Sequence, residues 1–221
     1  MSDLILYGPA YSVYTRIVRT VLEEKGLAYR LEEVDFISSG MPATQKERHP
    51  FGVVPVLAHD GEMFSETAAI TRYLDEMFPE PSLCPSKPSE RAHMAATISV
   101  LDQYLWPDIR ELVTQSLIAP IAGGWPDDLV VARMVKRLTG SLAILEEHFI
   151  AIGLLGGVRL SLADLHAGPM IAYLAETIEG QVLLKERAGL FAWWREIKQL
   201  PSLAATQFEL TDYPWARRET E

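Results

Sequence analysis

Residues 51–57 read Phe51-Gly52-Val53-Val54-Pro55-Val56-Leu57, and this stretch decides the fold. The β-branched and apolar residues on both sides of Pro55 favour a strand, but proline has no backbone N–H to donate to a neighbouring strand. A proline in such a pattern is typical of a sheet edge, a bulge or a turn, or of a cis peptide bond that bends the chain. We therefore expect a bent entry into a strand here, through an ordinary loop proline or a cis proline.

A second informative stretch follows about ten residues later, where Phe64-Ser65-Glu66-Thr67-Ala68-Ala69-Ile70 couples a short strand to a helix start. The first N–H groups of a helix have no partner inside the helix. A bent backbone edge beside such a helix start can hold a small zwitterionic peptide by its main chain. This is our working hypothesis for the site, although Glu66 and Thr67 could equally act only as helix caps.

The composition of the 221-residue chain is that of an ordinary globular protein, with 48% hydrophobic and 23% charged residues. Its formal net charge of −10 argues against a general nucleic-acid or anionic-membrane surface. The single cysteine, Cys84, excludes an internal disulfide, a CxxC redox pair and a cysteine metal cluster. No leader pattern is recognised, and no apolar run reaches the roughly 20 residues of a membrane span. We expect a cytoplasmic protein with no metal, nucleic-acid partner or membrane segment.

The first 79 residues predict a small α/β domain, because a strand–helix–strand pattern indicates a βαβ unit with parallel strands. Asp60-Gly61 between two short apolar runs is a hairpin signal. The segments read, in order, as a strand (4–7), a helix (13–25), a strand (31–36), an irregular stretch (38–49), two hairpin strands (55–58 and 62–64) and a helix (66–78).

Residues 79–88 contain four prolines, which predicts a linker that we take as residues 80–88. Residues 89–221 read as an all-helical domain whose helices end near prolines and glycines. Within it, Ser161 and Asp164 are typical of a capping box that starts a helix. The fold class is therefore α/β followed by all-α.

Ser12 lies in the turn between the first strand and the first helix, a place where ligands commonly meet α/β sheets. It can be the helix N-cap, and a hydroxyl there can also donate a hydrogen bond to a thiolate whose charge the helix dipole favours. Tyr7, at the end of the first strand, is the competing hydroxyl unless it only packs on the sheet. Tyr11 and Tyr14 flank Ser12 and are candidate walls of an apolar pocket.

These stretches carry a resemblance to a known family. Val54-Pro55 followed by residues 65–70 resembles the glutathione-site signature of the glutathione S-transferase family. Residues 7–16 are similar to its serine-type branches (theta, phi and many bacterial members), and residues 161–164 resemble the folding motif of its helical domain. The resemblance runs from Leu4 to about Phe208.

The resemblance implies a thioredoxin-like, glutathione-binding domain over residues 1–79. It also implies a helical-bundle domain over residues 89–221, with the electrophile site and dimer contacts. The expected activity is alkyl or aryl transfer to the thiol of reduced glutathione, the co-substrate, by a homodimer acting on small hydrophobic electrophiles.

Particular residues take roles by the same resemblance. Ser12 would stabilise the thiolate, and Val54, before a cis Pro55, would pair its backbone with the cysteinyl unit. Glu66 would meet the γ-glutamyl ammonium, and Thr67 the γ-glutamyl carboxylate. Val53 would lie beside glutathione, and Asp102 would reach the glutathione site of the partner subunit. The electrophile site would be lined by aromatic side chains, namely Tyr11, Tyr14, Tyr104 and Trp106. These aromatic residues are equally suited to the protein core.

The sequence departs from the family pattern where the glycyl carboxylate should be held. Val53 stands where relatives often carry Gln or Lys, and Gly40-Met41 where some branches carry a basic pair. Lys46, Arg48 or His49 is left for that task. His166 reads as a structural histidine. Other glutathione-dependent reactions, such as isomerisation or dehalogenation, and a non-catalytic binding protein of the same fold are the alternatives.

Overall fold

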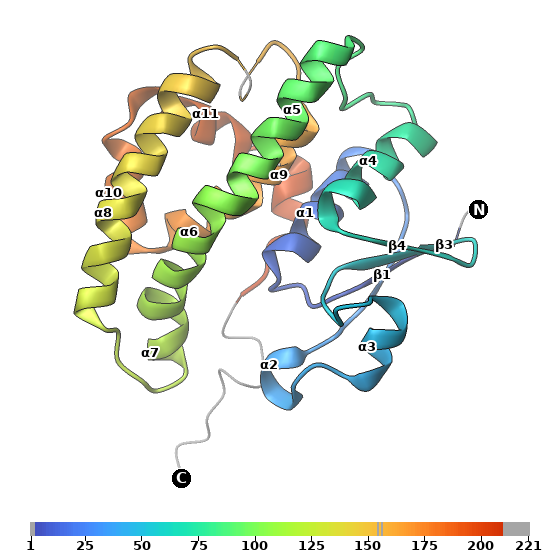
Figure 1. Ribbon diagram of the computed structural model, residues 1–221, viewed down its shortest axis with the longest axis horizontal. Coiled ribbons are helices and arrows are strands. Elements are labelled where there is room, and N and C mark those ends of the chain that lie inside the picture. Colours follow the sequence, from blue (N-terminus) through green and yellow to red (C-terminus); the bar gives the residue numbers. More distant parts are fainter. Residues whose placement is uncertain (1–2, 154, 156, 210–221) are drawn as a thin grey trace. The chain divides into compact units, whose positions relative to one another are not determined.

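The computed structural model describes residues 3–153, 155 and 157–209 (Figure 1). The described residues form two compact units: one joins residues 3–82 with residues 201–209, and the other lies within Leu83–Leu200. The first unit is α/β and the second is all-helical, as the sequence predicts.

The first unit is a four-stranded mixed sheet with helices. Its elements are β1 (Leu4–Tyr7), α1 (Val13–Glu24), β2 (Arg30–Glu32), α2 (Phe36–Ser39), α3 (Ala43–Arg48), β3 (Val56–His59), β4 (Glu62–Ser65), α4 (Thr67–Met77) and α12 (Pro201–Ala205). The strand order is β2-β1-β3-β4, with β2 parallel to β1 and β3 antiparallel to both β1 and β4. This is the thioredoxin-like arrangement that the resemblance implies.

The second strand is shorter than the sequence indicates. The expected strand over 31–36 ends at Glu32, and Phe36 begins α2 instead. The irregular stretch contains α3, whose N-cap position is Pro42. Proline fixes a φ that suits the residues around a helix start, which explains why this polar segment turns helical there.

The core of the first unit lies between the sheet and two helices, α1 and α4. Leu6, Ile17, Leu57 and Ile70 are fully buried there. A buried ion pair also joins these helices, with Lys25 Nζ 2.7 Å from Asp75 Oδ1. The same ammonium donates to the carbonyls of Phe78 at 2.7 Å and Pro81 at 2.8 Å, so three acceptors surround it.

Residues 201–209 belong with the first unit, which the sequence does not predict. Arg16 of α1 donates to the carbonyl of Leu203 at 3.2 Å, and Thr20 shares a hydrogen bond with buried Thr206 at 3.2 Å. The expected domain over 89–221 therefore loses residues 201–209 to the first unit, and residues 210–221 lie outside the described part of the chain.

Part of the expected linker over 80–88 packs into the second unit. Leu83 is buried in the second unit, where its carbonyl accepts a hydrogen bond from the backbone N–H of Leu162 at 3.0 Å. The unit boundary falls between Ser82 and Leu83. An apolar side chain inside a proline-rich stretch gains free energy by burial, which draws the linker onto the helices.

The second unit consists of helices, among which two long ones run side by side in Figure 1 (α5 to α6, green, and α8, yellow). A π-helical segment (η1) separates α5 from α6, a second (η2) follows α6, and a third (η3) follows the end of α8. The elements are α5 (Pro88–Val100), η1 (Leu101–Leu105), α6 (Trp106–Val113), η2 (Thr114–Ile118), α7 (Ala119–Ile121), α8 (Asp128–Leu145), η3 (Glu146–Ile150), α9 (Leu162–Glu176), α10 (Ile178–Lys185) and α11 (Ala188–Ile197). η1 ends two residues before Pro107, whose missing N–H breaks the helical bonding pattern.

Helix α9 forms the centre of this unit and is buried on almost every side. Its predicted capping box is confirmed: Ser161 Oγ accepts from the N–H of Asp164 at 3.4 Å, and Asp164 Oδ2 accepts from the N–H of Ser161 at 3.0 Å. Asp164 also accepts a hydrogen bond from the indole N–H of Trp193 at 2.9 Å. The cap therefore fixes both the start of α9 and its contact with α11.

Two features are missing from the described part of the chain. None of its helices has the length and apolarity needed to cross a membrane. Nor do its His, Cys, Asp and Glu side chains gather into a group of three or more that could hold a metal ion.

Candidate active site

Three segments of the first unit meet at one edge of its sheet. In the strand register, Val56 lies opposite Tyr7 of β1 on one side and Ser65 of β4 on the other. The chain reaches Ser12 just after β1, Pro55 just before β3 and Glu66 just after β4. The register therefore brings these three residues, far apart in sequence, to the same edge.

The Val54–Pro55 peptide bond is cis, as the resemblance implies. Pro55 is buried and Val54 is half-buried, while the β ladder begins only at Val56. Val54 therefore lies at the sheet edge outside the ladder, where its backbone can pair with an extended peptide.

Ser12 is the N-cap of α1, as the sequence predicts, with extended backbone angles (φ −74°, ψ 125°). Its Oγ accepts from the N–H of Thr15 at a long 3.4 Å, and the side chain is half-buried. A hydroxyl that accepts one such bond still has its own hydrogen to donate. The geometry suits a hydrogen bond from Ser12 to an anion at the helix start, where the dipole also favours negative charge.

The turn before Ser12 depends on Gly8. Its φ is +155°, and a Cβ built there would lie 2.3 Å from Oγ1 of Thr15. Any larger residue at position 8 would push against the first turn of α1, so glycine sets how closely β1 approaches the helix that Ser12 caps.

Glu66 is the second unusual backbone position of the site. Its φ of 67° and ψ of 117° are rare for a residue with a side chain, and non-glycine residues in such conformations cluster at functional sites. Glu66 occupies the N-cap position of α4 without a side-chain cap, and its own side chain is 73% exposed. Thr67 begins the helix and is buried. The start of α4 can therefore receive a carboxylate, while the Glu66 side chain faces solvent.

Buried polar side chains around α3 support the same edge. Gln45 is fully buried, and its Nε2 donates to the carbonyl of Val53 at 2.8 Å. His49 is 2% exposed, with Nε2 3.4 Å from Oε1 of Glu66. Sequence reasoning missed both contacts, because a polar residue in an irregular segment carries no pattern that marks it as buried.

The two competing hydroxyls have different surroundings. The guanidinium of Arg48 lies 4.1 Å from the centre of the Tyr7 ring, a cation–π contact that covers one face of the ring. Tyr7 sits on the sheet at the end of β1, whereas Ser12 caps the helix start. Of the two, only Ser12 lies where a helix dipole would stabilise an anion.

Tyr11 does not lie on an open pocket wall within its unit. Its hydroxyl donates to Asp35 Oδ1 at 3.0 Å and accepts from the N–H of Phe36 at 3.3 Å, and the ring packs edge-on against Phe36 at 5.4 Å. Burial, reinforced by the Asp35 carboxylate, raises the pKa of Tyr11 above its ordinary value. Tyr11 is therefore a core residue, which is the alternative to a pocket wall that the sequence left open. Tyr14 is half-buried in the first turn of α1.

The residues of the second unit that were named from the sequence also include both buried and exposed side chains. Trp106 is buried against Tyr173, with ring centres 5.9 Å apart, so it too is a core residue. Tyr104 is 66% exposed. Asp102 is 29% exposed and its Oδ1 lies 2.8 Å from Nε2 of buried His166, which agrees with a structural role for that histidine.

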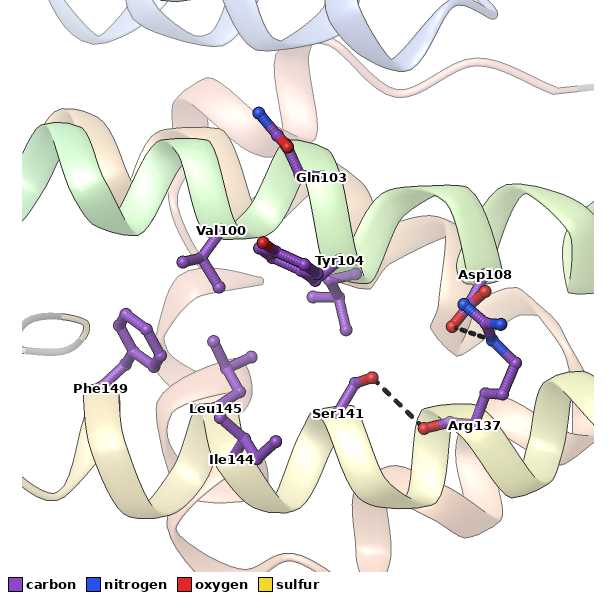
Figure 2. A pocket seen from close by; sticks show the side chains of 10 residues that line it. Val100, Gln103, Tyr104, Asp108, Arg137, Ser141, Ile144, Leu145 and Phe149 are labelled. Carbon is purple, nitrogen blue, oxygen red and sulfur yellow. Dashed lines mark hydrogen bonds and ion pairs between the residues drawn. The ribbon is translucent and has the colours of Figure 1, made fainter.

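Figure 2 shows a pocket of about 500 Å³ that lies wholly within the second unit, between the two long helices. Its walls are mainly apolar, and at one end Arg137 Nε donates to buried Asp108 at 2.9 Å. The π-helical segments η1 and η3 both contribute to it, and sequence reasoning did not predict it. The lining residues are Val100, Gln103, Tyr104, Leu105, Asp108, Arg137, Ser141, Ile144, Leu145 and Phe149.

A thioredoxin-like unit with a cis-proline edge, followed by an all-helical unit, defines the class of protein. Comparison with known proteins gives the family. A family model described as "Glutathione S-transferase, N-terminal domain" matches residues 6–82. Glutathione S-transferase F14 of Arabidopsis thaliana is 34% identical over 193 residues, which cover 84% of this chain and 75% of that protein.

Solved structures agree along nearly the whole chain. Glutathione transferase F7 from Populus trichocarpa aligns with a TM-score of 0.81 and 31% identity, covering 92% of this chain and 97% of that one. Glutathione S-transferase I "from mais in complex with atrazine glutathione conjugate" aligns with a TM-score of 0.82 and 28% identity, covering 92% and 96%. The chain belongs to the glutathione S-transferase family.

Proposed function

We propose that the protein conjugates reduced glutathione to small hydrophobic electrophiles, with Ser12 stabilising the glutathione thiolate. The observation that carries this proposal is the meeting of Ser12, the cis-proline edge and the α4 start at one edge of the sheet in a member of this family. The maize relative is described with an atrazine glutathione conjugate, which supports aromatic electrophiles as the first substrates to test.

Glutathione would lie along the bent edge. The backbone of Val54 pairs with the cysteinyl unit as an added strand does, beside Val53. The exposed carboxylate of Glu66 meets the γ-glutamyl ammonium, and Thr67 with the first N–H groups of α4 receives the γ-glutamyl carboxylate. The glycyl carboxylate then falls to the last turn of α3, which carries Lys46 and Arg48.

Chemically, the site would lower the pKa of the glutathione thiol from the ordinary cysteine value of about 8.5. The thiol proton leaves to solvent, and the Ser12 hydroxyl together with the α1 dipole stabilises the remaining charge. The sulfur then attacks the electrophilic carbon, forming a carbon–sulfur bond as the leaving group departs with its electron pair. Holding both reactants in one site supplies much of the rate increase.

The electrophile would be bound by the helical domain, where Tyr104 is the accessible aromatic candidate among those named from the sequence. Tyr14 belongs to α1 of the glutathione-binding unit, where it is half-buried. Trp106 would support this site from the core of the helical domain rather than touch the substrate, while Tyr11 is a core residue of the first unit. A cytoplasmic location belongs to the same proposal, in keeping with a chain that has one cysteine.

We also propose a homodimer. Phe51, next to the cis-proline edge, is 82% exposed, and the second unit carries the apolar pocket of Figure 2. A side chain of this size gains about 2–3 kcal/mol when its surface is buried, so a second copy is a suitable partner for both features. In such a dimer Asp102 would reach the glutathione site of the partner subunit.

The test is a pair of measurements on the full chain. Calorimetry should detect glutathione binding at submillimolar to millimolar concentrations, and an absorbance assay should detect conjugation to a chloronitrobenzene. Binding without turnover across several electrophile classes would favour a non-catalytic glutathione-binding protein. An absence of binding at millimolar glutathione would overturn the proposal.

A further inference from the structure

In the proposed glutathione site, the carboxylate of Glu66 must be oriented toward the ligand. Glu66 is held on a backbone with positive φ, and its side chain is 73% exposed. An exposed glutamate samples several rotamers, and ordering it on a ligand costs free energy. A contact that orders this side chain before glutathione arrives would lower that cost.

His49 provides such a contact. Its ring is 2% exposed, and its Nδ1 accepts the backbone N–H of Phe51 at 3.1 Å. A ring nitrogen that accepts a hydrogen bond carries no hydrogen, so in the neutral ring the hydrogen is on Nε2. That nitrogen lies 3.4 Å from Oε1 of Glu66. The Phe51 amide therefore sets the tautomer whose hydrogen is on the ring nitrogen that lies near the carboxylate.

The backbone anchors His49 on the same helix that supports the cis-proline edge. His49 ends α3, and its N–H donates to the carbonyl of Gln45 at 2.9 Å. Gln45 in turn donates to the carbonyl of Val53 at 2.8 Å. One turn of α3 thus touches both halves of the proposed glutathione site, the segment before Pro55 and the residue before α4.

We propose that His49 is a positioning residue for glutathione: it orients Glu66 through Nε2, so that the second carboxylate oxygen can receive the γ-glutamyl ammonium. This inference rests on the proposed function, because it takes Glu66 as the ammonium's partner. His49 itself touches no reacting atom, so its effect falls on glutathione affinity and not on the chemical step.

Two matched variants separate positioning from packing. In His49→Gln the side-chain amide places an N–H near the position of Nε2, whereas in His49→Asn the amide oxygen can replace Nδ1 as the acceptor for Phe51 but cannot reach Glu66. We expect His49→Asn and His49→Leu to raise the KM for glutathione about three- to tenfold. The value of kcat at saturating glutathione and the KM for the electrophile should not change. His49→Gln should restore the KM to within about twofold of the wild type.

The other outcomes are decisive. If His49→Asn matches the wild type and His49→Gln does not, the Phe51 contact is what matters and the positioning role is wrong. Equal losses in all variants, in step with their thermal unfolding midpoints, would show a purely structural histidine. If Glu66→Gln raises the KM while His49→Asn leaves it unchanged, this inference fails and the proposed function stands. A wild type that binds no glutathione overturns both.

Discussion

Lys25, the C-cap residue of α1, and Asp75 of α4 form a buried ion pair, with Nζ 2.7 Å from Oδ1 and both side chains almost wholly excluded from solvent. The pair ties together two of the helices that flank the sheet, and α1 and α4 also start at the proposed glutathione site. The separation of those helix starts therefore depends on a contact at the opposite ends of the same helices.

Removing one partner of this pair should destabilise the protein strongly. Lys25→Met leaves a buried carboxylate without its cation and the Phe78 and Pro81 carbonyls without their donor, and we expect a loss of about 3–5 kcal/mol. Denaturant unfolding measures it. Arg72→Gln, which removes the exposed pair with Glu76, is the control and should cost less than about 1 kcal/mol. Similar losses in the two variants would contradict the importance of burial.

Ser12→Ala should lower kcat/KM for conjugation by more than about tenfold, equivalent to about 1.4 kcal/mol, because the thiolate loses its hydrogen-bond donor. Glutathione should still bind, since Val54, Glu66 and Thr67 are intact. The thiolate absorbance of bound glutathione, followed against pH, should titrate at higher pH in the variant. Tyr7→Phe is the matched control and should keep its activity. The reverse pattern would assign the activating hydroxyl to Tyr7.

Binding of the glycyl carboxylate of glutathione should depend on the basic side chains in the last turn of α3. Lys46 packs its side chain against Gly52, beside Val53, whereas the guanidinium of Arg48 is engaged with the Tyr7 ring. We expect Lys46→Met to raise the KM for glutathione about three- to tenfold and Arg48→Met to change it less. Steady-state kinetics at varied glutathione distinguishes them. Unchanged KM values in both variants would place the carboxylate's partner elsewhere.

Tyr11 should make the protein sensitive to alkaline pH. Its pKa is raised in the folded protein, mainly by burial and also by Asp35, while the unfolded chain ionises tyrosine near pH 10. The unfolded state therefore releases this proton first, so stability is retained below about pH 10 and falls as the pH rises further. Tyr11→Phe should lose about 1–2 kcal/mol at pH 7 but fall less steeply above pH 10. Parallel slopes of unfolding free energy against pH would refute this.

Phe51 should matter for assembly. We expect Phe51→Ser to raise the dimer dissociation constant by at least about tenfold, because a large apolar side chain is lost from the interface. Size-exclusion chromatography with light scattering over a dilution series measures it. Trp125→Ser, which removes another strongly exposed aromatic residue, is the control and should leave the dimer unchanged. Dissociation of the control alone would place the interface elsewhere.

Local sequence signals account for much of the fold and part of the site. The hydroxyl of Ser12 before an apolar helical pattern predicted an N-cap, and Ser161 with Asp164 predicted a capping box; both are found. The bent entry at Pro55 followed from the proline alone, because its ring removes a donor from a strand pattern. Each of these signals lies within a few residues of the feature that it predicts.

The amino-acid sequence by itself determined the order of an α/β and a helical unit, the bend at Pro55 and the caps of α1 and α9. Only the tertiary structure decided that Tyr11 and Trp106 are core residues, that His49 faces Glu66, and that residues 201–209 return to the first unit. The physical reason is the separation along the chain of the groups that interact. Caps and bends depend on the bonding needs of neighbouring backbone groups, whereas burial and side-chain partners depend on which distant surfaces pack together.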